Sequence, residues 1–145
     1  NNEWRWVMDV NLMGVINGTQ VMVPHIKQHG EGGWLLNVAS MAGMGGVPYG
    51  GAYTASKVAV VGMSESWYAE LQQHNIQVSV LCPAFVKTRI NLSMRNKQSD
   101  YKTGKAKKEI TPQQANSHLA SPDFQSAWPS TALAAVLGRC CYQKL

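Results

Sequence analysis

Residues 34–57, WLLNVASMAGMGGVPYGGAYTASK, decide the fold that this chain of 145 residues can adopt. The run 34–40 is short and apolar, which is typical of a buried strand. A glycine-rich turn follows at 41–51, and a helical pattern continues from there to about residue 75. A buried strand that leads through a turn into a long helix is typical of an α/β sheet. The stretch predicts that Ser40, at the strand end, shares a sheet edge with the start of this helix.

Two side chains near the start of the predicted helix, Tyr53 and Lys57, are four residues apart and leave the same helix face. An ammonium about 4 Å from a phenol favours the ionised phenol by up to about 4 kcal/mol at an effective dielectric of about 20. With the hydroxyl of Ser40, the pair can exchange a proton with a carbonyl or alcohol oxygen. The alternative is a surface pair on an amphipathic helix. A second pair, Tyr101 and Lys105, lacks both the long helix and the glycine turn.

Four segments of the chain resemble the short-chain dehydrogenase/reductase family in order and spacing. They are VNLMG around Asn11, LLNVASMAG at 35–43, YTASK at 53–57 and VLCPAFVKTRI at 80–90. The resemblance covers residues 1 to about 92. It implies an α/β fold with a Rossmann-like, doubly wound parallel sheet, of which this chain is the C-terminal portion. It also implies an oxidoreductase that interconverts an alcohol and a carbonyl with NAD or NADP.

The resemblance assigns catalytic roles to four residues. Ser40 and Tyr53 bind the substrate oxygen, and Tyr53 acts as the general acid or base. Lys57 holds the nicotinamide ribose and supports the ionisation of Tyr53, so both residues also contact the cofactor. Asn11 anchors a water that relays protons toward Lys57.

The same resemblance places the nicotinamide against the segment that follows the next strand. Pro83, Ala84, Val86 and Thr88 are the expected cofactor contacts in this segment. Ala84 stands where the family usually has glycine, and alanine takes a positive φ less readily than glycine. We therefore expect a shifted backbone or a more loosely held cofactor at this position.

The family's phosphate-binding turn, G-x-G-x-x-G, is not present in the sequence. We expect residues 1–145 to form a single partial domain, the C-terminal part of a longer enzyme. A sheet without its partner strands exposes unpaired backbone and apolar side chains, so we expect poor solubility or self-association of the chain alone.

The first thirty residues have the periodicity of a helix buried along one side. Its apolar positions are Met8, Leu12, Val15, Met22 and Ile26, with Thr19 between them. Gly30 is expected to end the helix. His25 and His29 are four residues apart near that end, which suits a helix C-terminus, and we predict no metal site.

The helix at 51–75 carries a stripe of small residues beside a stripe of bulkier ones. The small residues are Ala55, Ala59, Gly62, Ser66 and Ala69, and the bulkier ones are Val60, Met63, Trp67 and Leu71. The small stripe either packs against the sheet or pairs with a second subunit, as this helix does in the family. The resemblance thus favours a homo-oligomer.

Residues 87–108 hold six lysines, two arginines and one aspartate, and they supply most of the net charge of +5. In the family this region closes over the substrate. We interpret 87–110 as a flap that is either solvated and mobile or carries basic residues that bind an acidic substrate or a cofactor phosphate. A nucleic-acid partner is not predicted, because the segment has one aromatic residue, Tyr101, and no binding motif.

No apolar run of eighteen residues or signal peptide is visible, so we predict no membrane association. The three cysteines have no metal spacing, and a reducing cytoplasm is expected. A final apolar segment predicts a helix that ends at Gly138.

Two other functions remain open: a non-catalytic remnant that acts only by association, and a sugar epimerase or dehydratase, which uses the same Tyr and Lys spacing.

Overall fold

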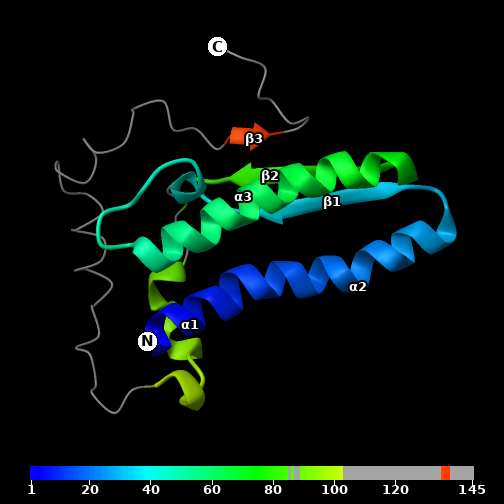
Figure 1. Cartoon of the computed structure of the whole chain (residues 1–145). Helices are drawn as coiled ribbons and strands as arrows, with labels where there is room; N and C mark the ends of the chain where they lie inside the picture. Colours follow the sequence, from blue (N-terminus) through cyan, green and yellow to red (C-terminus); the bar gives the residue numbers. More distant parts are fainter. Residues whose placement is uncertain (85, 87–88, 103–134, 138–145) are drawn as a thin grey trace.

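The computed structural model of the chain describes residues 1–84, 86, 89–102 and 135–137 (Figure 1). The α-helices are α1 (Asn2–Met8), α2 (Gly14–His29) and α3 (Gly51–Leu71), and the strands are β1 (Gly33–Val38), β2 (Ile76–Cys82) and β3 (Ala135–Leu137). A π-helical turn, Asp9–Met13, joins α1 to α2. Short 3₁₀-helices occur at Met41–Gly43, Gln72–His74, Ile90–Asn96 and Ser99–Tyr101.

The strands form one sheet in the order β1-β2-β3. β1 and β2 are parallel. Their paired residues run from Gly33 opposite Ile76 to Val38 opposite Leu81. Helix α3 makes the connection between them, which is the crossover that parallel strands require. The predicted α/β fold is therefore confirmed. The helix predicted near the C-terminus is wrong at Ala135–Leu137, because this segment pairs with β2 as an antiparallel strand.

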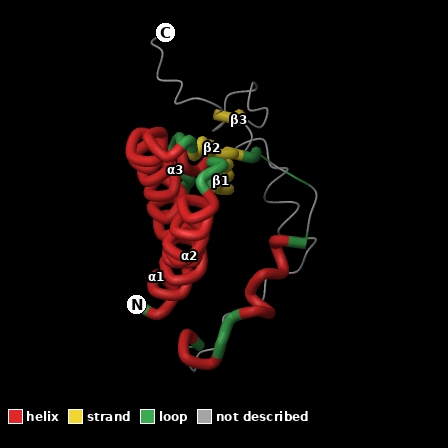
Figure 2. The backbone as a smooth tube through the Cα atoms, turned by 90° about the vertical axis from the view of Figure 1, so that its right-hand side faces the viewer, coloured by secondary structure: helices red, strands yellow, loops and turns green. Residues whose placement is uncertain are grey.

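The core lies between the sheet and the helices, which Figures 1 and 2 show packed beside the strands. Every second side chain of β2 is buried: Ile76, Val78, Val80 and Cys82. Leu12 and Val15 pack at one end of this row, and Val23 and Ile26 of α2 pack at the other. α2 and α3 therefore cover the same face of the sheet.

The two stripes on α3 face different surroundings. Val60 and Leu71 of the bulkier stripe are buried, and Met63 and Trp67 pack against the core. The small stripe is exposed at Gly62, Ser66 and Ala69. Packing of the small stripe against the sheet is therefore wrong at these three residues, and subunit pairing remains a prediction.

The helix expected over the first thirty residues is interrupted by the π-helical turn, which the sequence pattern did not predict. Thr19 is buried as expected, but Met22 is 51% exposed, so the prediction of a continuous buried stripe is wrong there. Gly30 ends α2 in a left-handed conformation with φ of 74°, as predicted.

The sheet face opposite the helices exposes large apolar side chains. Trp34, Leu36 and Val38 alternate along β1 and are 79%, 58% and 50% exposed. β1 is also an edge strand of the described sheet. An apolar face on an edge strand is the feature that underlies the expected poor solubility.

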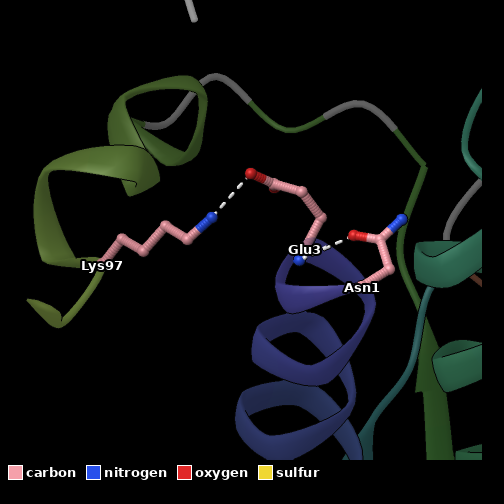
Figure 3. A network of polar contacts seen from close by, with 3 residues as sticks. All are labelled: Asn1, Glu3 and Lys97. Carbon is pink, nitrogen blue, oxygen red and sulfur yellow. Dashed lines mark hydrogen bonds and ion pairs between the residues drawn. The ribbon is translucent and has the colours of Figure 1, made fainter. Parts of the chain in front are cut away.

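The segment 89–102 is attached by polar contacts to α1 and to the first residue of the π-helical turn, Asp9. Lys97 Nζ lies 2.7 Å from Glu3 Oε1 (Figure 3) and 5.2 Å from the centre of the Trp6 ring. The Tyr101 hydroxyl donates to Asp9 Oδ2 at 2.9 Å. Lys97 is only 5% exposed, so the interpretation of the basic flap as solvated is wrong at this residue. The flap residues 87–88 and 103–110 lie outside the described residues.

We expect Lys97→Ala to loosen the segment around residues 90–101. A hydrogen bond between charged partners contributes roughly 1.5–3 kcal/mol, so amide hydrogen exchange there should accelerate by about tenfold or more. Hydrogen exchange followed by mass spectrometry measures this effect. Lys102→Ala, which changes an exposed lysine, is the matched control and should leave exchange unchanged. Equal exchange in both variants would contradict the anchoring role of Lys97.

Candidate active site

Tyr53 and Lys57 lie in the first two turns of α3, which begins at Gly51. Lys57 Nζ is 5.8 Å from the centre of the Tyr53 ring, so the ammonium and the phenol share one face of the helix. This arrangement follows from the local geometry of the helix.

The Lys57 side chain also contacts the end of β1. Its Nζ donates a hydrogen bond to the carbonyl oxygen of Val38 at 3.1 Å. Val38 is the last residue of β1, and Ser40 follows two residues later. The start of α3 is thereby held at the carboxyl end of the strand, where the sequence predicted that the strand and the helix would meet.

Ser40 begins the 3₁₀-helix Met41–Gly43. Its Oγ accepts a hydrogen bond from the backbone N–H of Ala42 at 3.2 Å, and its backbone is extended. The Met41 N–H donates to the carbonyl oxygen of Pro83 at 3.0 Å. Because of this bond, the segment after β2 lies beside the turn that contains Ser40.

Gly43 permits a close approach between this turn and α3. A Cβ atom at Gly43 would lie 2.8 Å from the carbonyl oxygen of Lys57 and 2.9 Å from Val61 Cγ2. A side chain of any size is therefore excluded unless the turn moves away from the helix. The sequence indicated a glycine-rich turn but not which glycine the packing requires.

The charge state of Lys57 depends on its surroundings. Burial lowers the pKa of the Lys57 ammonium from its ordinary value of 10.5, and the nearby Cys82 opposes this effect. Burial raises the pKa of the Cys82 thiol, while a backbone hydrogen bond from Ser40 and the Lys57 charge oppose the rise. Nothing in the sequence indicated that Cys82 lies near Lys57, because their proximity depends on how α3 packs against the sheet.

Asn11 lies in the π-helical turn and is connected to α3. Its Nδ2 donates to Ser56 Oγ at 3.3 Å, and Ser56 Oγ donates to the carbonyl oxygen of Tyr53 at 2.7 Å. The structure thus joins Asn11 to the helical turn that carries Tyr53 and Lys57. Ser56 was not among the predicted site residues, and the sequence marks it only by its place between Tyr53 and Lys57.

The expected cofactor contacts are described in part. Pro83 and Ala84 follow β2 directly, Val86 is 61% exposed, and Thr88 lies outside the described residues. Positive φ angles at described non-glycine residues occur at Tyr49 and Asn75. Ala84 therefore has no left-handed strain, and a more loosely held cofactor at this position stays a prediction.

His25 and His29 lie near the end of α2, where the sequence predicted no metal site. His29 Nδ1 accepts a hydrogen bond from the Glu31 N–H at 3.2 Å. Within the described ranges, no group of three or more His, Cys, Asp or Glu residues is placed to hold a metal ion.

None of the helices in the described part of the chain has the length and hydrophobicity that spanning a membrane requires.

The chain is similar in sequence to known dehydrogenases and reductases. A family model described as short chain dehydrogenase matches residues 1–99. A 3-oxoacyl-acyl-carrier-protein reductase of Thermotoga maritima is 44% identical over 87 residues, which cover 59% of this chain and 35% of that protein. The NAD(+) 15-hydroxyprostaglandin dehydrogenase of Rattus norvegicus is 34% identical over 105 residues, which cover 68% of this chain and 40% of that protein.

Among solved structures, a short chain dehydrogenase/reductase from Burkholderia phymatum in complex with NAD is similar to this chain. It is 34% identical with a TM-score of 0.72, and the match covers 92% of this chain and 46% of that one. This chain spans 35% and 40% of the length of the two curated relatives above.

Gly43→Ala should destabilise the fold, because the new methyl group meets the backbone of α3. Overpacking of this kind costs roughly 1–3 kcal/mol of unfolding free energy. Urea denaturation monitored by circular dichroism measures the loss. Gly45→Ala is the matched control, since nothing lies within 4 Å of a Cβ at that position. If the two variants unfold at the same urea concentration, the tight contact at Gly43 is not present.

Lys57 should also titrate differently in the native and unfolded chains. Because its native pKa is lowered, the native chain binds this proton less tightly. Charging Lys57 therefore opposes folding at pH values below its native pKa, and this penalty disappears as the pH rises through 10.5. Trace acetylation over a pH series, read by mass spectrometry, should give a midpoint below that of the urea-unfolded chain. An equal or higher midpoint in the native chain contradicts the burial of the ammonium.

Proposed function

This chain belongs to the short-chain dehydrogenase family, and we propose that it carries the catalytic part of an NAD- or NADP-dependent oxidoreductase. The proposed reaction interconverts an alcohol and a carbonyl in a small-molecule substrate. The main support is the convergence of Tyr53, Lys57 and the turn containing Ser40 at the carboxyl end of β1. In open α/β sheets, ligands bind outside the carboxyl ends of the strands.

Tyr53, Ser40 and Asn11 have different proposed roles in the reaction. In the oxidation direction, the Tyr53 oxygen takes the proton of the alcohol hydroxyl as the carbon–oxygen double bond forms. In reduction, Tyr53 returns a proton to the same oxygen. The Ser40 hydroxyl donates a hydrogen bond to that oxygen and holds it at Tyr53. Asn11 anchors the water through which the site exchanges protons with solvent.

Lys57 is suited to hold the ribose of the cofactor. An ammonium has three N–H donors, and the structure assigns one of them to the Val38 carbonyl oxygen. The other two can bind ribose hydroxyls without loss of the contact to β1. Pro83, Ala84 and Val86 are the residues proposed to contact the nicotinamide. When bound, the nicotinamide accepts or supplies the hydride that balances the alcohol and carbonyl forms.

A second candidate is association without turnover. It is favoured by the exposure of three small residues on α3, Gly62, Ser66 and Ala69, which leaves a surface where another backbone can approach closely. In both candidates, this stripe is the proposed contact with a second copy of the chain. Binding of NAD or NADP separates them, because a bound cofactor raises the unfolding temperature. A chain whose stability is unaffected by millimolar NAD and NADP supports association alone.

Tyr53→Phe should abolish nearly all turnover while cofactor binding stays close to normal. The test uses a chimera in which the 87 matching residues of this chain replace the corresponding segment of the Thermotoga maritima reductase. Removal of a general acid should lower kcat by about 100-fold or more, because the phenyl ring keeps the packing but has no exchangeable proton. Nicotinamide absorbance measures the rate.

Tyr68→Phe is the matched control for this variant. It makes the same chemical change on the same helix, where the Tyr68 ring packs against the core beside Leu71 and Ile76. We expect its turnover to equal that of the unmodified chimera. Undiminished turnover in Tyr53→Phe would refute the assignment of the proton donor.

A further inference from the structure

Ser56 stands between Tyr53 and Lys57 in the sequence, but its side chain is fully buried, with 0% exposure. Its Oγ donates a hydrogen bond to the Tyr53 carbonyl oxygen at 2.7 Å and accepts one from Asn11 Nδ2 at 3.3 Å. Both the donor and an acceptor position of the hydroxyl are therefore engaged. This hydroxyl joins α3 to a segment that is 45 residues away along the chain.

The segment that Ser56 contacts has an unusual backbone. Asn11 is the central residue of the π-helical turn Asp9–Met13. Such turns contain one residue more than an α-helical turn and are found frequently at functional sites. The side chain of Asn11 bonds across to α3, so the turn is held in place from outside its own helix.

The hydrogen-bond chemistry fixes the orientation of the Asn11 amide. A serine hydroxyl has one hydrogen, and at Ser56 that hydrogen is directed to the Tyr53 carbonyl oxygen. Only acceptor positions remain toward Asn11, so the amide presents its NH₂ group to Ser56. Its oxygen, Oδ1, must then face away from Ser56. Without the hydroxyl, nothing in this contact distinguishes the two orientations of the amide.

We propose that Ser56 is a positioning residue of the active site. It holds the Asn11 amide in one orientation and fixes the π-helical turn against the turn of α3 that carries Tyr53 and Lys57. The inference rests on the proposed function, in which Asn11 anchors the water that exchanges protons with the site. Ser56 itself acts through Asn11, because its hydroxyl is buried and already engaged as both a donor and an acceptor.

Helix α3 contains a second serine with the same bonding, which serves as an internal control. Ser64 Oγ donates to the Val60 carbonyl oxygen at 2.7 Å and accepts from Asn37 Nδ2 at 3.0 Å. Ser64 is 3% exposed. It binds α3 to β1 rather than to the π-helical turn. Loss of either hydroxyl removes equivalent bonds, but only Ser56 contacts Asn11.

The first test needs neither cofactor nor turnover. In the full 145-residue chain labelled with ¹⁵N, the side-chain NH₂ group of Asn11 is observed by NMR. Ser56→Ala should shift its resonances and accelerate its hydrogen exchange by about tenfold, the factor expected when about 1.4 kcal/mol of hydrogen bonding is lost. Ser64→Ala should leave the Asn11 signal unchanged. Ser56→Thr keeps the hydroxyl and should retain the protection, and it serves as the test if Ser56→Ala does not fold.

The second test measures turnover in the chimera described above. Ser56→Ala should lower kcat by about tenfold and change the KM for the nicotinamide by less than about twofold, because geometry rather than binding is lost. Ser64→Ala should keep the kcat of the unmodified chimera. The double variant Asn11→Ala, Ser56→Ala should be no slower than Asn11→Ala alone, because Ser56 acts through Asn11.

The two tests separate failure of this inference from failure of the proposed function. An Asn11 signal that Ser56→Ala leaves unchanged overturns the positioning role, whatever the turnover. A double variant much slower than Asn11→Ala alone overturns it as well. If the unmodified chimera has no turnover, the proposed function fails, and the NMR result alone decides whether Ser56 orients Asn11.

Discussion

The hydrogen bond from Lys57 Nζ to the Val38 carbonyl oxygen is the contact on which the arrangement of the site depends. It connects the first turns of α3 to the last residue of β1, and it does so with a partly buried charged group. Partial burial of an ammonium costs less where it donates a hydrogen bond, as Lys57 does here. The side chain therefore fixes the position of Tyr53 relative to the strand end, and its own pKa is lowered by the same burial.

Small residues make the close packing around this contact possible. Gly43 lets the turn after Ser40 lie on the backbone of α3, and Ser56 and Ser64 let the helix approach its neighbours while their hydroxyls bond to two asparagines. Buried polar groups of this kind are tolerated because each hydroxyl is satisfied as both donor and acceptor. The result is a helix held in position by directional bonds as well as by the apolar contacts of its bulkier stripe.

The contact between the segment 89–102 and α1 also buries a polar group that has a partner. A run of lysines and arginines is typically solvated, yet Lys97 is buried against the Trp6 ring and paired with Glu3. The partner is 94 residues away along the chain. A charge pattern describes only neighbours in sequence, so it could not predict this pairing. The pair places the segment that leaves β2 alongside α1, the helix that leads into the turn of Asn11.

By itself, the sequence determined the features that local geometry controls. The four-residue spacing of Tyr53 and Lys57 and the glycine that ends α2 follow from the 3.6-residue repeat of a helix and from backbone sterics. Only the tertiary structure decided which side chains from distant segments meet. The π-helical turn at Asn11, its bond to Ser56 and the proximity of Cys82 to Lys57 depend on how α3 packs against its neighbours. These contacts have no local signal, because each is selected by the shape and hydrogen bonding of a partner many residues away.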